Sequence, residues 1–123
     1  MRTARWLILL AGIVMFLAGL AHTIGYGFVM PVLVKSNLPA QIVDAIRCVW
    51  LVYSVHLILL SVAIVWISRL PGTRSLLLFL ALVPIFDAFF MFHFVGPFLG
   101  LYMVATSAVL LLIGAWLLPR KAG

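Results

Sequence analysis

The sequence predicts an all-α integral membrane protein, a compact bundle of four transmembrane helices in an up-down-up-down arrangement. Of its 123 residues, 67% are hydrophobic and 8% are charged, whereas a soluble domain has about 45–50% apolar and about 25% charged residues. A transmembrane helix needs roughly 20 apolar residues, so four spans with short connections use nearly the whole chain. We therefore expect residues 1–123 to form a single transmembrane domain.

The first two spans are the longest apolar runs. The first covers approximately residues 6–30 and should end before Pro31. The second covers residues 39–68 and opens at a proline, which is favoured in the first turn of a helix. At about 1.5 Å per residue, the second run is longer than a hydrocarbon core of about 30 Å. Its start, around Asp44 and Arg47, should project into the headgroup region.

The last two spans are separated by a helix stop. The third covers residues 75–95 and the fourth covers residues 97–118, with Gly96 and Pro97 at the junction. Glycine commonly ends a helix and proline is tolerated in the first turn of the next. Pro84 lacks an N–H, so we expect a bend within the third span.

Basic residues at the ends of the spans orient the predicted bundle. Both termini should be cytoplasmic, because loops on that side carry an excess of lysine and arginine. Six basic residues fall on the cytoplasmic side and two outside: Arg2, Arg5, Arg69, Arg74, Arg120 and Lys121 against Lys35 and Arg47. This placement accounts for the net charge of +6 without nucleic acid, which we do not expect as a partner. We expect a multi-pass protein of a prokaryotic cytoplasmic membrane, with the lipid bilayer around it.

Small residues at heptad spacing predict where the helices approach one another. Seven-residue spacing favours a left-handed crossing, and helices in lipid associate through small residues and interhelical hydrogen bonds. We therefore expect two seams inside the bundle, formed by Ala11, Ala18 and Gly25 of the first span and by Gly100, Ser107 and Gly114 of the fourth.

The ionisable residues within the spans gather in the predicted outer half. An ionised carboxylate at the depth of Asp87 costs several kcal/mol unless it faces the interior or has a partner. His56 is its best partner, because counting about 1.5 Å per residue places the two at similar depths. His22 falls on the small-residue seam and should point inward. We expect Asp87, His56 and His22 to face one another as a catalytic acid-base group.

Four further polar side chains are candidates for contact with a substrate. They are Tyr53, Tyr102, Thr106 and His93. Tyr102 would donate a hydrogen bond to a substrate oxygen. Structural roles compete with these assignments, because tyrosine commonly anchors a helix at the membrane interface and a histidine as close to the interface as His93 is expected to be hydrated.

These residues predict a membrane-embedded enzyme that moves protons on a lipophilic small molecule, in an isomerisation, cyclisation or epoxide opening. Three alternatives remain: an accessory subunit of a larger complex or homo-oligomer, a proton-coupled exporter with Asp87 as proton carrier, and haem or metal ligation by His22 and His56. We expect no cofactor, because the spread in depth disfavours a site that uses all three histidines. Cys48 is the only cysteine, which excludes a dithiol oxidoreductase.

Overall fold

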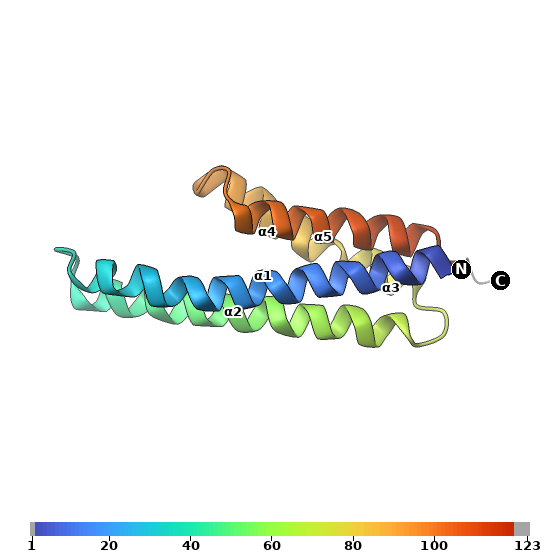
Figure 1. Ribbon diagram of the computed structural model, residues 1–123, viewed down its shortest axis with the longest axis horizontal. Coiled ribbons are helices and arrows are strands. Elements are labelled where there is room, and N and C mark those ends of the chain that lie inside the picture. The colour runs from blue at the N-terminus through green and yellow to red at the C-terminus, as the bar shows by residue number, and fades with distance from the viewer. Residues whose placement is uncertain (1, 120–123) are drawn as a thin grey trace.

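The computed structural model describes residues 2–119, and within that range it contains helices and no strands. Four stretches are long and apolar enough to cross a membrane, as predicted, the third consisting of two helices in succession. Figure 1 shows the stretches lying side by side, with consecutive ones running in opposite directions. The helices are α1 (Arg2–Val34), α2 (Ala40–Ser68), α3 (Arg74–Leu80), α4 (Leu82–Phe94) and α5 (Leu99–Trp116).

Helix α1 is longer than the predicted span of residues 6–30. It begins at Arg2 and continues through Pro31 to Val34. A proline within a helix removes one hydrogen bond, here the bond to the carbonyl of Gly27. Proline has a helical φ of about −65°, and the three residues that follow Pro31 can still donate their own N–H groups, so the loss of one bond does not stop the helix. The prediction that the helix ends before this proline was therefore wrong.

The third span is interrupted where the sequence predicts a bend. Helix α3 ends at Leu80 and α4 begins at Leu82. Pro84 has no N–H to donate to the Leu80 carbonyl, and the next donor, the Ile85 N–H, reaches the Ala81 carbonyl at 3.3 Å. The missing bond separates one predicted helix into two helices that follow each other in the same direction.

The two ends of the bundle differ in charge. The start of α1 lies beside the end of α2 and the start of α3 (Figure 1), and we call this the basic end because it carries Arg5, Arg69 and Arg74. The opposite, distal end holds the loop of residues 35–39. There the α1–α2 hairpin reaches well beyond the turn between α4 and α5 (Figure 1), because α1 and α2 are the longest helices. Two residues of the predicted cytoplasmic set, at positions 120 and 121, lie outside the described residues.

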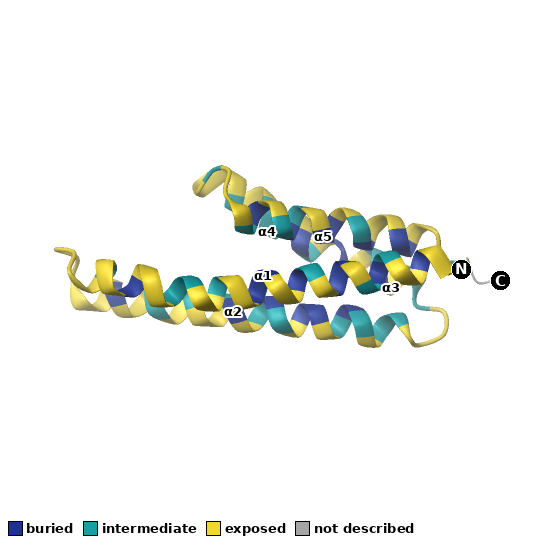
Figure 2. Cartoon of the chain, in the orientation of Figure 1, coloured by how far each residue is buried: buried dark blue, intermediate teal, exposed yellow. Residues whose placement is uncertain are grey.

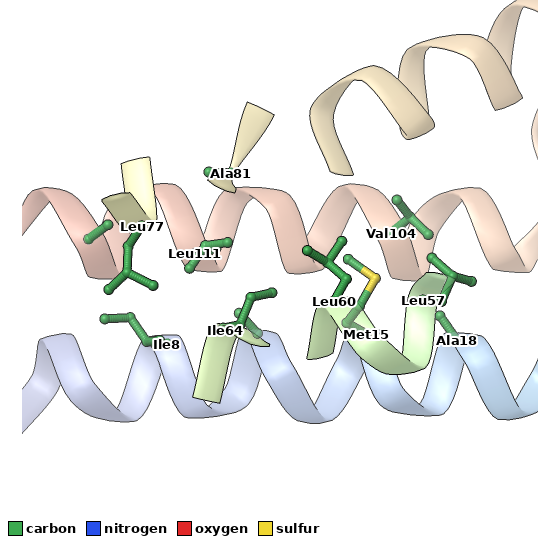
Figure 3. Packing of buried hydrophobic residues seen from close by; sticks show 12 residues of the cluster. Ile8, Met15, Ala18, Leu57, Leu60, Ile64, Leu77, Ala81, Val104 and Leu111 are labelled. Carbon is green, nitrogen blue, oxygen red and sulfur yellow. The ribbon is translucent and has the colours of Figure 1, made fainter. Parts of the chain in front are cut away.

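The apolar core occupies the half of the bundle nearer the basic end. Figure 2 shows the buried residues concentrated there, while the distal part of the α1–α2 hairpin is largely exposed. Ile8, Ile64, Leu77 and Leu111 come from four different helices and are fully buried. Figure 3 shows Met15 farther along α1, beside Leu57 and Leu60 of α2. Helix α4 contributes only Pro84 to the buried set of the described residues, so it is the least enclosed helix.

The predicted small-residue seams lie between the helices. Ala11 and Ala18 are buried, and the Ser107 hydroxyl donates a hydrogen bond to the Ala11 carbonyl at 2.8 Å. Gly114 packs so closely on α1 that an added Cβ would lie 2.7 Å from Ile8 Cγ1. Two other glycines of α1, at positions 12 and 19, face α2 instead. Helix α1 therefore carries small residues on two faces and contacts both neighbours closely.

Large apolar side chains cover much of the outer surface. Phe28 and Phe94 are each 76% exposed, and Trp6 is 66% exposed. A soluble monomer rarely shows a contiguous apolar patch larger than a few hundred Å². Four apolar helices with an apolar exterior are consistent with a multi-pass membrane protein.

Candidate functional site

An ionisable pair joins the second and third spans in the distal half. His56 of α2 and Asp87 of α4 lie with Nε2 and Oδ2 3.1 Å apart. When the carboxylate is ionised, the imidazole N–H is the donor and the hydrogen bond is charge-assisted. Both side chains are half-buried. The pairing that the sequence predicts from depth is thus present, and each group has the partner that an ionisable residue in an apolar bundle requires.

Tyr53 connects this pair to the rest of the bundle. It lies three residues before His56 on α2, so the two rings share a helix face, and they stack with centroids 5.7 Å apart. Its hydroxyl donates to the Met91 sulfur at 3.5 Å, and Met91 lies one turn after Asp87 on α4. Close backbone packing between α2 and α4 is absent within the described helices. Long side chains therefore bridge the space between these two helices.

His22 extends the cluster to the first helix. Its ring stacks on Trp50 of α2 with centroids 4.4 Å apart and an interplanar angle of 11°. The Trp50 indole N–H donates to the His22 carbonyl at 2.8 Å. The edge-to-face contact between His22 and Tyr53, at 5.1 Å, completes a continuous series of rings. We call Trp50, His22, Tyr53, His56 and Asp87 the distal cluster.

A cavity of about 430 Å³ lies beside the distal cluster, between α1, α2, α4 and α5. We call it the distal cavity. Its volume is within the range of small-molecule sites, about 300–1,000 Å³. His22, Trp50 and Tyr53 line it, together with apolar residues that include Phe98 and Met103. A second hollow, of about 390 Å³, shares those three aromatic residues. His56 and Asp87 line neither space. Tyr53, which lines both spaces and stacks on His56, connects the pair to the cavity.

The structure does not bring three of the predicted substrate contacts to this cluster. Tyr102 is 59% exposed, and Thr106, one turn later on α5, is also exposed. The buried face of α5 at this level carries Leu101 and Val104 instead. His93 is exposed and stacks on Phe89 of its own helix, with centroids 6.2 Å apart.

Two members of the site were not identified as such from the sequence. Neither Trp50 nor Met91 is among the candidate residues predicted from the sequence. Their spacing carried a signal, because Trp50 precedes Tyr53 by three residues and Met91 follows Asp87 by four, which places each pair on one helix face.

No group of three or more histidine, cysteine, aspartate or glutamate side chains with metal-binding geometry occurs among residues 2–119. The Tyr53 ring contacts both His22 and His56. No protein-family model, curated protein or solved structure matches this chain. Interpretation of the site therefore depends on its own geometry.

Proposed function

We propose that this protein crosses a prokaryotic cytoplasmic membrane four times, with both termini in the cytoplasm, and catalyses proton transfer on a lipophilic small molecule. The observation that carries the proposal is the 3.1 Å contact between His56 and Asp87, linked by Tyr53 to a largely apolar cavity. A carboxylate and an imidazole in contact can exchange a proton near neutral pH, which suits general acid-base chemistry.

The proposed roles follow from what each side chain touches. The apolar walls of the distal cavity hold the substrate, and His22 and Tyr53 present polar groups to it. Asp87 and His56 hold the proton that is exchanged, and the Tyr53 hydroxyl, which is also hydrogen-bonded to the Asp87 side chain, is placed to convey it to the substrate. Isomerisation, cyclisation and epoxide opening all require one proton to be added at one atom and one to be removed at another, so no redox partner is needed.

The test compares the wild-type protein with Asp87→Asn. Purified protein in liposomes is incubated with a bacterial lipid extract, and the products are identified by mass spectrometry. Asn keeps the size and hydrogen bonding of the side chain but cannot titrate, so product formation should fall by about 100- to 10,000-fold, the usual contribution of a general acid or base.

Asp44→Asn is the matched control. Asp44 is the only other acidic side chain of the chain, it is exposed, and it pairs with Arg47 on the same helix at 3.2 Å. Its replacement should leave product formation unchanged. An Asp87→Asn protein that forms product at the wild-type rate would contradict the acid-base proposal.

A second candidate function is an accessory subunit of a larger membrane complex. The observation that favours it is the distal part of the α1–α2 hairpin, which extends beyond α4 and α5 (Figure 1) and exposes Ile24, Phe28 and Val32 by 64%, 76% and 71%. A partner helix would cover these side chains. Copurification of a stoichiometric second membrane protein, together with full activity of the complex in Asp87→Asn, would favour this function over catalysis.

A further inference from the structure

A groove at the basic end is separate from the distal cavity. We call it the basic-end groove; it has a volume of about 360 Å³ and is formed by α1 and α2 alone. Its lining is apolar except for a serine and a terminal arginine. The residues are Gly12, Ile13, Phe16 and Leu17 of α1, Ser61, Val62, Val65 and Trp66 of α2, and Arg69, which directly follows α2.

The groove exists because the two helices approach closely at a glycine. A Cβ added at Gly12 would lie 2.6 Å from Val65 Cγ2, so the floor is narrow and the larger side chains stand on either side of it. Phe16 is 40% exposed on one side, and Val62 is 54% exposed on the other. From Ser61 to Arg69 the groove follows α2 for about 12 Å, at about 1.5 Å per residue. Its shape and polarity suit part of a hydrocarbon chain.

Positive charge stands at one end of the groove, and no ion pair to it occurs within residues 2–119. Arg69 belongs to the lining. Arg5 lies seven residues before Gly12 and eleven before Phe16, about two and three helical turns, so it lies on the same face of α1. Both arginines are exposed.

Neither of the two acidic side chains of the chain reaches these arginines. Asp44 pairs with Arg47 near the distal end, and Asp87 pairs with His56. The groove is therefore apolar along its length and positive at its mouth, and any counter-ion from an acidic side chain must come from outside this chain.

We propose that the basic-end groove binds one acyl chain of an anionic phospholipid, with Arg69 and Arg5 on the phosphate of the headgroup. Guanidinium groups match phosphate oxygens in charge and in bidentate geometry. Basic residues next to a membrane span attract anionic lipids of the cytoplasmic leaflet, the leaflet that the proposed topology places at this end. The inference is independent of the chemistry at the distal cluster.

Native mass spectrometry of the protein released from detergent micelles tests the proposal. The probes are phosphatidylglycerol and phosphatidylcholine with identical acyl chains, titrated separately. The wild-type protein should retain one phosphatidylglycerol more tightly than phosphatidylcholine. Arg5→Gln and Arg69→Gln should each weaken phosphatidylglycerol binding about fivefold, the contribution of one basic residue at an anionic surface. Lys35→Gln, with the same loss of charge at the distal end, should have no effect.

A second pair of variants tests the acyl-chain site without changing charge. Val62→Trp places a large ring in the groove and should abolish retention of phosphatidylglycerol. Val52→Trp is its control, because Val52 is 62% exposed on the same helix and does not line the groove. Equal binding of the two lipids by the wild-type protein would overturn the proposal, and so would undiminished phosphatidylglycerol binding by Val62→Trp or by the double variant Arg5→Gln/Arg69→Gln.

Discussion

A single buried hydroxyl ties the first helix to the last. Ser107 is fully buried and donates to the Ala11 carbonyl at 2.8 Å. We expect Ser107→Ala to lower the free energy of unfolding in mixed micelles by about 0.6 kcal/mol, and by no more than about 1.7 kcal/mol, the range measured for interhelical hydrogen bonds in a membrane protein.

Ser61→Ala is the matched control for this bond. Ser61 is also buried, but its hydroxyl donates to the Ile58 carbonyl of its own helix at 2.7 Å. Its removal breaks no link between helices and should cost less than Ser107→Ala. A larger loss for Ser61→Ala would show that the bond between α1 and α5 does not stabilise the bundle.

The side chains of the site show which aspects of a residue's position can be predicted from its place in a sequence. Depth follows from counting along a helix, and depth alone pairs His56 with Asp87. The face of a helix depends on its rotation, which the small-residue seams fix for both α1 and α5. Tyr102 follows Gly100 of the α5 seam by two residues, about 200° around the helix, and is exposed, whereas His22, on the seam of α1, was correctly predicted to point inward.

At the level of whole helices, close approach between α1 and α5 depends on one glycine. A Cβ at position 114 would lie 2.7 Å from Ile8 Cγ1 and 3.1 Å from two backbone atoms of α1. Backbone cannot move aside as a flexible side chain can, so the helices must separate. Gly114→Ala should lower the free energy of unfolding by about 1–3 kcal/mol, the usual cost of overpacking.

Gly27→Ala should have the opposite effect. An added Cβ at Gly27 meets nothing within 4 Å, and alanine is favoured over glycine within a helix by about 0.8–1 kcal/mol. The two variants make the same chemical change in α5 and α1, and both are measured by reversible unfolding in the same micelles. Destabilisation of equal size in both would mean that crowding at Gly114 is not the cause.

The effect of a proline was predictable where it lies within a helix and not where it lies near an end. Pro84 has a helical turn on either side, so its missing N–H interrupts the span. Pro31 lies in the last turn of α1, where only three helical residues follow it, so the loss of one bond does not end the helix earlier. At Pro84 the sequence therefore predicted a bend where the structure has two helices, and at Pro31 it predicted a boundary where the helix continues.

The bundle as a whole divides into a packed half and an open half. Four helices meet around Ile8, Ile64, Leu77 and Leu111 near the basic end, while at the distal end α4 and α5 are short and α2 reaches α4 through side chains. Rigid packing in one half holds the helices in register, and space remains in the other half for a cavity beside the distal cluster. Composition and periodicity predicted the four helices; this uneven distribution of space depends on helix lengths and rotations that only the folded chain fixes.

The orientation of the whole molecule is the last prediction. Arg5, Arg69 and Arg74 lie at the basic end, and Lys35 and Arg47 lie toward the opposite end. An excess of basic residues marks the cytoplasmic side, so the loop containing Lys35 should face outward and the α2–α3 turn inward. Single cysteines introduced as Lys35→Cys and Pro71→Cys, in a Cys48→Ser background, test this with a thiol reagent that cannot cross the membrane.

Pro71 is chosen for the inner turn because the next residue, Gly72, has a φ of 68°, a conformation that residues with a side chain rarely adopt. In intact cells, position 35 should react and position 71 should react only after the membrane is made permeable. Reaction at position 71 alone in intact cells would show that the bundle has the opposite orientation in the membrane. The distal cluster would then lie in the cytoplasmic half of the bilayer, and the basic-end groove would face the lipids of the outer leaflet.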